Sequence, residues 1–395
     1  MENPKIRFKG YTKDWEQRKL GELGTVQTCK RIFKDQTSEK GDIPFFKNGT
    51  IGLEPDSYIS REMYEEFRRL YPYPEVGDTL ISVVGSIGRT AEYTGKDEYF
   101  QDSNVVWLKT DGSINKKFLK ISYQVIKWLI EGSTVKHLYN DNILRSEIIM
   151  PVSQIEQAKI AEFFEELDHL ITLHQRKCEQ TKKLKKYMLQ KMFPQNGAKV
   201  PEIRFDGFTY DWEQRKLSEL LEKYEDPVET PHDGYERVGI RSHAKGTFHS
   251  FVEPGKELDT AKMYRVAADK FILNITFAWE HAVAITDNND AGKLVSHRFP
   301  QFSFNPKLKP HFFKYLMLDK KFREHLELSS PGGAGRNRVL KISDMLKYEI
   351  KLPSIEEQIK IGEYFDSLDH LITLHQRKCD ELKKMKKYML QNMFI

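Results

Sequence analysis

Apolar side chains recur at gaps of three and four residues along two long stretches, one after Ser153 and one after Ser354. The intervening positions are mostly Lys, Glu and Gln, so each apolar set forms one stripe on a long helix, as in a coiled coil. About forty residues of helix would measure about 60 Å. The stripe positions are Ile160, Phe163, Phe164, Leu167, Leu170, Ile171, Cys178, Leu184, Met188 and Met192, then Ile361, Tyr364, Phe365, Leu368, Leu371, Ile372, Cys379, Leu382, Met385, Met389 and Met393.

Each predicted helix opens with the same start signal. Ser153 is followed three residues later by Glu156, and Ser354 by Glu357, with a proline just upstream in both cases. The pattern S-x-x-E predicts a capping box, in which serine and glutamate satisfy free amide groups of the first turn.

Two segments of the chain are written twice. The letters LDHLITLHQRKC at residues 167–178 return unchanged at residues 368–379, and IRFKGYTKDWEQRKLGEL at residues 6–23 returns nearly unchanged as IRFDGFTYDWEQRKLSEL at residues 203–220. The order is therefore short repeat, variable insert, long helix, and then the same again. The alternative is duplication with drift, but drift alone should have changed the repeats as well as the inserts.

The two inserts, residues 24–150 and 221–352, are similar in length and share no obvious letter-level similarity. Buried-strand patterns, aromatic helical spacing and Gly/Asn loops predict mixed α/β domains. The predicted strands are 78–84 and 270–276, and the predicted helices are 118–130 and 311–328.

A lone helix with an apolar stripe would expose that stripe to water, so we expect the two copies to pack against one another. An antiparallel pair would place one insert at each end and relate the halves by a pseudo-twofold axis. The alternative is that each helix packs only on its own insert.

Two histidines and two cysteines repeat on the predicted seam, namely His174, Cys178, His375 and Cys379. Such a set suits zinc, but we expect ordinary seam residues and no metal. The sequence leaves open whether the four approach one another.

The C-terminal parts of both helices are basic, and a solvated face explains this as well as a docking face does. The candidates for subunit docking are Lys182, Lys183, Lys186, Lys383, Lys384 and Lys387.

Composition adds limits to this picture. The chain has 395 residues, 39% hydrophobic, 12% aromatic and 31% charged, with net charge +5, which is too mild to prove nucleic-acid binding. Three scattered cysteines do not form a disulfide framework, so we expect a reducing cytoplasm. The polar start and the absence of eighteen consecutive apolar residues predict neither a signal peptide nor a membrane span.

Polar and basic loops in the inserts have the side chains that read DNA. They are GSIGRT at 85–90, GSTVKHLYNDN at 132–142, RSHAKG at 241–246, SHR at 296–298 and PGGAGRNR at 331–338. Arg bonds guanine, Asn and Gln bond adenine, and Lys, Ser and backbone amides hold phosphates. The candidate DNA-binding residues are Lys30, Arg31, Lys47, Asn48, Ser86, Arg89, Lys136, His137, Asn140, Arg241, His243, Lys245, His297, Arg298, Arg336, Asn337 and Arg338.

Catalytic signatures are missing from the sequence. It contains no phosphate-binding G-x-x-x-x-G-K-[ST], no HExxH, no GxSxG and no Asn-Pro-Pro-aromatic tetrapeptide of amino-methyltransferases. We therefore predict no catalytic residues.

The chain resembles the specificity subunit of type I restriction-modification systems. The resemblance rests on the doubled order, on DWEQRKLGEL and DWEQRKLSEL, on GDTLISVVGSIGRT at 77–90 and on the helix starts PVSQIEQAKI and PSIEEQIKI. In the second insert, FILNITFAWEHAVAI at 271–285 replaces the glycine turn, which leaves that part of the pattern unmatched.

The resemblance implies an α+β fold with two globular mixed α/β target recognition domains, separated by two long antiparallel coiled-coil helices with pseudo-twofold symmetry. The domains would be 1–152 and 196–352, and the helices 153–195 and 353–395.

The resemblance also implies a non-catalytic subunit that binds double-stranded DNA and reads a bipartite, asymmetric target. It would dock two modification subunits, which methylate adenine with S-adenosylmethionine, and restriction subunits, which use ATP and Mg to translocate and cut DNA. The chain itself would need no cofactor. The rival interpretation is an adaptor whose helices tether two protein-binding domains without touching DNA.

Overall fold

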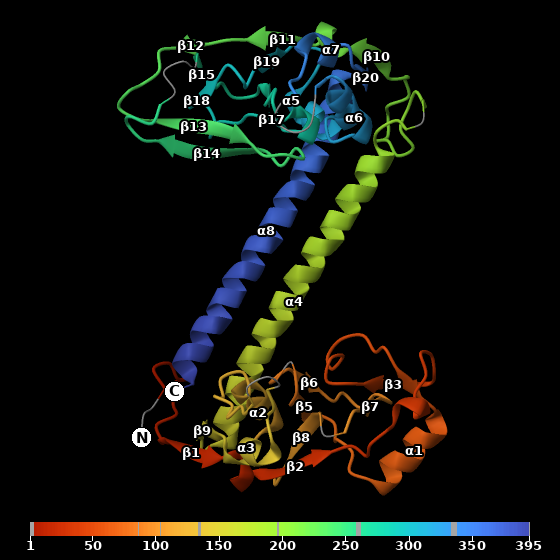
Figure 1. Cartoon of the computed structure of the whole chain (residues 1–395), viewed down its shortest axis with the longest axis vertical. Helices are drawn as coiled ribbons and strands as arrows, with labels where there is room; N and C mark the ends of the chain where they lie inside the picture. Colours follow the sequence, from red (N-terminus) through yellow and green to blue (C-terminus); the bar gives the residue numbers. More distant parts are fainter. Residues whose placement is uncertain are drawn as a thin grey trace. The chain divides into compact units, whose positions relative to one another are not determined.

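The computed structural model describes residues 4–85, 87–102, 104–132, 136–195, 197–257, 262–332 and 338–394. The chain divides into two compact units. Unit 1 comprises Met1–Gln175 with Arg377–Ile395, and unit 2 comprises Arg176–Gln376. Each long helix, α4 (Gln154–Lys191) and α8 (Ile355–Met393), contributes one part to each unit (Figure 1). The predicted division of the chain treats the helices, 153–195 and 353–395, as segments separate from the domains 1–152 and 196–352.

The elements of unit 1 lie mostly before α4. Its strands are β1 (Trp15–Lys19), β2 (Gly24–Thr28), β3 (Ile43–Phe46), β4 (Tyr58–Ile59), β5 (Thr79–Ser82), β6 (Thr90–Glu92), β7 (Tyr99–Phe100), β8 (Val105–Thr110) and β9 (Glu147–Pro151). Its shorter helices are α1 (Arg61–Leu70), α2 (Lys116–Ser122) and α3 (Asn140–Arg145).

The elements of unit 2 lie between the two long helices. The strands are β10 (Glu213–Lys216), β11 (Leu221–Tyr224), β12 (Pro227–Val228), β13 (Tyr235–Ile240), β14 (Thr247–Val252), β15 (Met263–Arg265), β16 (Phe271–Leu273), β17 (Val283–Ile285), β18 (Leu294–Ser296), β19 (Gln301–Phe304) and β20 (Glu349–Leu352). The shorter helices are α5 (Pro310–Leu316), α6 (Lys320–Leu328) and α7 (Ile342–Met345).

One sheet has the same strand order in both units, although the inserts share no obvious sequence similarity. The order is β2-β8-β5-β6 in unit 1 and β11-β19-β16-β17 in unit 2, and every pair is antiparallel. The second sheet differs, with β4-β3-β7 against the longer β12-β15-β18-β13-β14. Each unit therefore carries one constant sheet and one that varies.

The short repeat pairs with the strand that leads into the long helix. Strand β1 pairs with β9 and β10 with β20, both antiparallel, with Trp15 opposite Pro151 and Glu213 opposite Leu352. The repeated letters thus build a second constant element in each unit.

The long helices pack antiparallel within each unit, as the stripes predict. In unit 1, the rings of Phe164 and Phe394 lie 6.0 Å apart, and Lys386 bonds Asp168 at 2.8 Å. Positions early in α4 therefore meet positions late in α8. The buried cluster around this contact also contains residues of the insert, so α4 packs both on α8 and on its own insert, and the alternative of packing on the insert alone is wrong. The members of this cluster include Ile160, Phe164, Leu167, Ile171, Cys379, Leu382, Met393, Phe118 and Ile121.

Unit 2 repeats this arrangement with the other parts of the helices. The rings of Phe193 and Phe365 lie 6.0 Å apart, and Lys185 bonds Asp369 at 2.5 Å. Among the described residues, no helix has both the length and the apolar run that crossing a bilayer requires.

The capping signal is half confirmed. The hydroxyl of Ser153 accepts the backbone N–H of Glu156 at 3.4 Å, and Ser354 accepts that of Glu357 at 3.3 Å. The glutamate side chains do not turn back to the serines in the way that the box predicts, because arginines of the short repeat bind them.

This second contact forms what we call the clasp of each unit. Arg7 bonds Glu156 through Nε at 2.7 Å and Nη2 at 2.9 Å, and Trp15 Nε1 donates to the same carboxylate at 3.3 Å. Arg204 bonds Glu357 through the same two nitrogens, both at 2.7 Å. Two segments about 150 positions apart are joined in this way in each unit.

The local predictions for the inserts hold in part. The predicted strands are observed as the shorter β5 and β16, but the helix expected at 118–130 ends at Ser122. The stretch 311–328 forms two helices, because Asp319 caps a new helix by accepting the N–H of Lys321 at 3.4 Å. Helical spacing alone does not reveal such an internal cap.

Candidate nucleic-acid interface

In unit 1 the candidate site is built on the turn between β5 and β6. The chain reverses at Gly85 and Gly88, whose φ angles of +68° and +79° disfavour any residue with a Cβ. Ser82 closes the turn, since its N–H donates to Arg89 and its carbonyl accepts from Gly88, both at 2.9 Å. The predicted glycine turn is therefore a real hairpin connection in the constant sheet.

Several predicted residues converge on this turn. Asn48 Nδ2 donates to the carbonyl of Val84 at 3.0 Å, and Arg89 Nη1 donates to the carbonyl of Gly49 at 3.0 Å. His137 forms an antiparallel bridge with Val84, and its ring stacks on that of Tyr139 at 4.5 Å. The structure thus brings together three segments that are far apart in the sequence.

Three more cations of unit 1 are already engaged. The Lys30 ammonium lies 4.9 Å from the centre of a tyrosine ring. Arg31 forms an ion pair with Asp102 at 2.6 Å, and Lys47 one with Asp56 at 2.9 Å. The Lys47 ammonium holds the pKa of Asp56 below its usual range. The Lys47–Asp56 pair is exposed, and exposed pairs are weak, so a phosphate can replace the Asp56 carboxylate at little cost.

The remaining candidates of unit 1 lie on the flank of this group. Lys136 and Asn140 are exposed, and Asn140 begins α3. Ser86 lies outside the described residues.

In unit 2 the corresponding place belongs to residues 274–282, which connect β16 to β17. This connection, which we call the unit 2 connection, contains a 3₁₀ turn over Ala278–Glu280 and no glycine. It occupies the position of the glycine turn because the strands on either side hold equivalent positions in the constant sheet. Letter comparison does not detect this equivalence.

The hairpin turn between β13 and β14 docks on the unit 2 connection. His243 N–H donates to the carbonyl of Glu280 at 2.9 Å, and Ser242 Oγ donates to its carboxylate at 2.6 Å. His243 and Ala244 adopt left-handed φ angles of 62° and 52°, so the turn is tightly constrained.

Two further segments meet the same connection. Ile275 N–H donates to the carbonyl of Arg298 at 3.0 Å. The Arg338 guanidinium carbon lies 5.5 Å from the centre of the Trp279 ring. Candidates from three separate loops therefore surround one connection.

The other candidates of unit 2 have more peripheral places. Arg241 bonds the carbonyl of Thr247, and its guanidinium carbon lies 5.3 Å from the centre of the Phe248 ring. Lys245 and His297 are exposed. Arg336 and Asn337 lie outside the described residues.

Sequence reasoning missed Ser242, Trp279 and Glu280. A cavity of about 420 Å³ opens between the β13–β14 hairpin and the unit 2 connection, and its lining includes Phe248, Ser242 and Glu280. The predicted strand at 270–276 could have indicated Trp279 and Glu280, because the residues that follow this strand occupy the position of the glycine turn.

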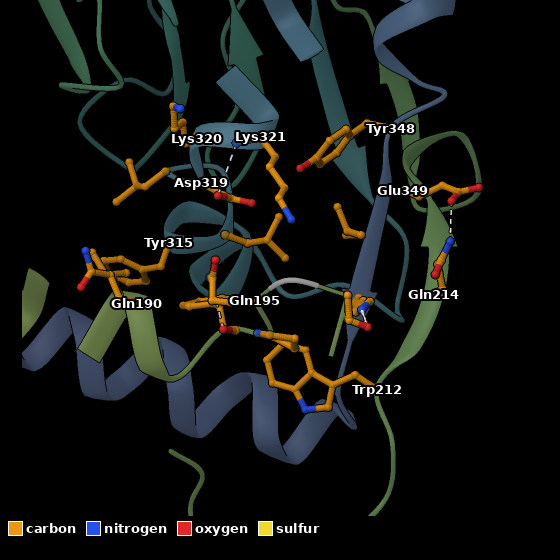
Figure 2. Close-up of a pocket in the computed structure, with 18 of the residues that line it drawn as sticks. Gln190, Gln195, Trp212, Gln214, Tyr315, Asp319, Lys320, Lys321, Tyr348 and Glu349 are labelled. Carbon is orange, nitrogen blue, oxygen red and sulfur yellow. Dashed lines mark hydrogen bonds between the residues drawn. The ribbon is translucent and has the colours of Figure 1, made fainter. Parts of the chain in front are cut away.

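A cavity of about 660 Å³ lies beside the repeated segments of unit 2, between the end of α4 and the strands β10 and β20 (Figure 2). Its walls include Trp212, Tyr348 and Lys186, the last a docking candidate. Unit 1 has a cavity of about 540 Å³ in the equivalent place, with Phe394 in its lining. Because these cavities border the repeated segments, they suit a partner common to both units better than a base-specific contact.

The docking candidates are exposed, and the structure separates them from two neighbouring lysines. Lys185 and Lys386 bind Asp369 and Asp168 across the helix pair, at 2.5 Å and 2.8 Å. The exposed lysines are Lys182, Lys183, Lys186, Lys383, Lys384 and Lys387.

The seam cysteines have protein surroundings. Cys178 Sγ lies 3.8 Å from both the carbonyl of Ile372 and the side-chain oxygen of Gln376, and Cys379 is buried in the unit 1 cluster. Within the described ranges, no group of three or more His, Cys, Asp or Glu side chains is arranged to hold a metal ion.

Comparison with known proteins places the whole arrangement in context. The family model of the type I restriction modification DNA specificity domain matches residues 12–183 and 210–384. A Haemophilus influenzae protein described as a type I restriction enzyme specificity subunit is 46% identical over 157 residues, 39% of this chain and 41% of that protein. The match thus spans less than half of that relative.

Two other relatives are matched along nearly their whole length. A Methanocaldococcus jannaschii protein described as a type I restriction enzyme specificity subunit is 25% identical over 418 residues, 95% of this chain and 92% of that protein. The crystal structure of a type I restriction-modification S subunit from M. genitalium aligns with a TM-score of 0.63, covering 100% and 99% of the two chains at 15% identity. The second likeness is one of fold.

Proposed function

The chain belongs to the type I restriction modification DNA specificity family, and from this premise we propose that it selects the DNA target of a type I restriction-modification complex. The observation that carries the proposal is the pair of units, each with the same constant sheet and a different connection, with an arginine at it, between the equivalent strands β5 and β6 or β16 and β17. Different connections on one frame suit an asymmetric target read in two halves. The adaptor alternative is not favoured, because the matched family is one of DNA specificity.

We propose that the long helices set the distance between the two half-sites. Each helix runs unbroken from one unit into the other, over 38 residues in α4 and 39 in α8. Two readers on one face of a duplex need a separation of about 34 Å or a multiple of it. A helix of about 57 Å is long enough to hold such a spacing.

We propose that partner subunits dock on the long helices and on the cavities that border the repeated segments. The exposed lysines of the two helices and the cavities beside Trp212 and Phe394 occur once in each unit, which suits two copies of a modification subunit. S-adenosylmethionine, ATP and Mg would bind to the modification and restriction subunits. This chain would be non-catalytic and would act in the cytoplasm.

The decisive experiment expresses the chain with its modification subunit and maps methylated adenines across a genome. A split motif with a fixed gap is expected. Methylation with no dependence on this chain, or a single continuous motif, would contradict the proposal. The chain alone should give no methylation.

Salt dependence separates the two classes of function. Specific DNA affinity should fall steeply as salt rises, because each neutralised phosphate releases a counterion. An adaptor would show no sequence-specific binding at any salt concentration.

A further inference from the structure

In each unit, one buried leucine of the insert bonds to the connection between equivalent strands of the constant sheet. Leu138 N–H donates to the carbonyl of Val83 at 2.9 Å, and Leu340 N–H donates to the carbonyl of Ile275 at 2.8 Å. Val83 directly follows β5, and Ile275 lies two positions after the end of β16. Both strands belong to the hairpin of the constant sheet. The backbone of the residue two positions before each leucine therefore lies near the equivalent hairpin connection of its unit.

That residue is Lys136 in unit 1 and Arg338 in unit 2. Both are cationic, but only Arg338 lies over an aromatic ring of the connection, with its guanidinium carbon 5.5 Å from the centre of Trp279. A lysine acts as a mobile point charge, whereas an arginine stacked on a ring presents a planar fork in a defined direction.

The Trp279 ring is itself held in place. Its Nε1 donates to the carbonyl of Thr276 at 3.1 Å, within the same connection. Arg338 is further restrained by Glu327, whose carboxylate lies 3.5 Å from Nη1. Among the described residues, the Nε and Nη2 edge of the guanidinium has no hydrogen-bond acceptor. Two neighbours thus orient the fork, and the described part of the chain leaves its Nε and Nη2 edge without an acceptor.

We propose that Arg338 reads a guanine in the half-site bound by unit 2 and that Trp279 is the positioning residue that aims it. A guanidinium edge matches O6 and N7 of guanine in the major groove, and the match depends on direction as well as charge. The inference rests on the proposed function and deepens it, because it names the residue pair and the base. Lys136, which has no ring beneath it among the described residues, contributes charge without this directional preference.

The test uses the full chain in complex with its modification subunit and reads base preference from methylation of a randomised target library. Replacing residues 24–150 with another insert first identifies which half-site belongs to unit 2. The variants are Arg338→Lys, Trp279→Phe and Trp279→Ala. The control is Tyr210→Ala, which removes an aromatic side chain that is 86% exposed in the short repeat.

Arg338→Lys should lower the preference for guanine at one position of the unit 2 half-site by about 10- to 100-fold and leave the other half-site unchanged. Trp279→Ala should relax the same position by a smaller factor, and Trp279→Phe should retain most of the preference because it keeps a ring face. The control should change neither half-site.

Several results would overturn the inference while leaving the proposed function intact. One is a split motif whose unit 2 half-site contains no guanine on either strand. Another is unchanged specificity in Arg338→Lys, a conservative variant that keeps the charge and does not depend on the fate of Trp279→Ala. Loss of any split motif with the unchanged chain would instead reject the proposed function itself.

Discussion

Replacing Arg204 by Met should destabilise unit 2 strongly, because the clasp carboxylate would lose its counter-charge. The side chain of Glu357 is 0% exposed and that of Arg204 is 14% exposed, and two bonds of 2.7 Å join them. Removing one partner of a buried ion pair costs about 3–5 kcal/mol, since the remaining charge stays in a low-dielectric site. For a unit of this size, that is about 6–20 °C in Tm.

The reverse change, Glu357→Gln, should cost less, about 1–3 kcal/mol. The remaining Arg204 is partly exposed and can turn toward water. The double variant, with Arg204→Met and Glu357→Leu, replaces the pair by apolar groups of similar size and should recover most of the loss. The diagnostic quantity is therefore the coupling between Arg204→Met and Glu357→Leu, for which the single variant Glu357→Leu is measured as well.

Unit 1 provides a matched control with one difference. Glu156 also accepts the indole N–H of Trp15 at 3.3 Å, whereas Trp212 Nε1 has no hydrogen-bond partner in the described part of unit 2. A double apolar variant of the Arg7 clasp should leave a buried N–H unpaired and retain a penalty of about 1–3 kcal/mol.

Urea unfolding followed by hydrogen exchange resolves the two units separately. Slow amides of α5 and β20 report unit 2, and those of α2 and β9 report unit 1. The reasoning fails if Arg204→Met costs under about 1 kcal/mol, or if the unit 2 double variant is as unstable as the single one.

Three other predictions concern acid stability, target choice and spacing. Burial alone would raise the pKa of Asp366, but hydrogen bonds from Lys314, Tyr315 and His311 outweigh it and hold this pKa below its ordinary value of 3.8. Since the pKa of Asp366 is lower in the folded than in the unfolded chain, the stabilisation exists above pH 3.8 and is lost as pH falls through the folded pKa. Asp366→Asn should therefore flatten the change of Tm between pH 5 and about pH 2.5. An unaltered slope of Tm against pH would contradict this. Exchanging residues 24–150 for another insert should change one methylated half-site only, and a change in both would mean that the inserts do not read independently. Adding seven residues to both long helices keeps the stripe nearly in phase and lengthens each by about 10 Å, so mapped methylation should show a spacer about three base pairs longer with both half-sites intact; altered half-sites would reject the role of the helices in spacing.

The sequence alone determined the features that depend on local periodicity and on repetition. The stripes predicted α4 and α8 to within two residues of their starts, and the repeats predicted two equivalent frames with helices packed antiparallel. The glycine turn at 85–90 was identified because glycine has a conformational signature that survives without tertiary context.

Only the tertiary structure decided which distant groups meet. In the folded chain, the capping glutamates bind arginines of the short repeat. The segment FILNITFAWEHAVAI occupies the position at which the other insert has a glycine turn. Trp279 is a candidate positioning residue because the Arg338 guanidinium lies over its ring, a contact that the sequence does not reveal. The physical reason is that helix periods and turns are encoded by residues that are neighbours in the chain. A buried ion pair or a position in a sheet is instead selected by the packing of whole elements, and different sequences can give the same packing.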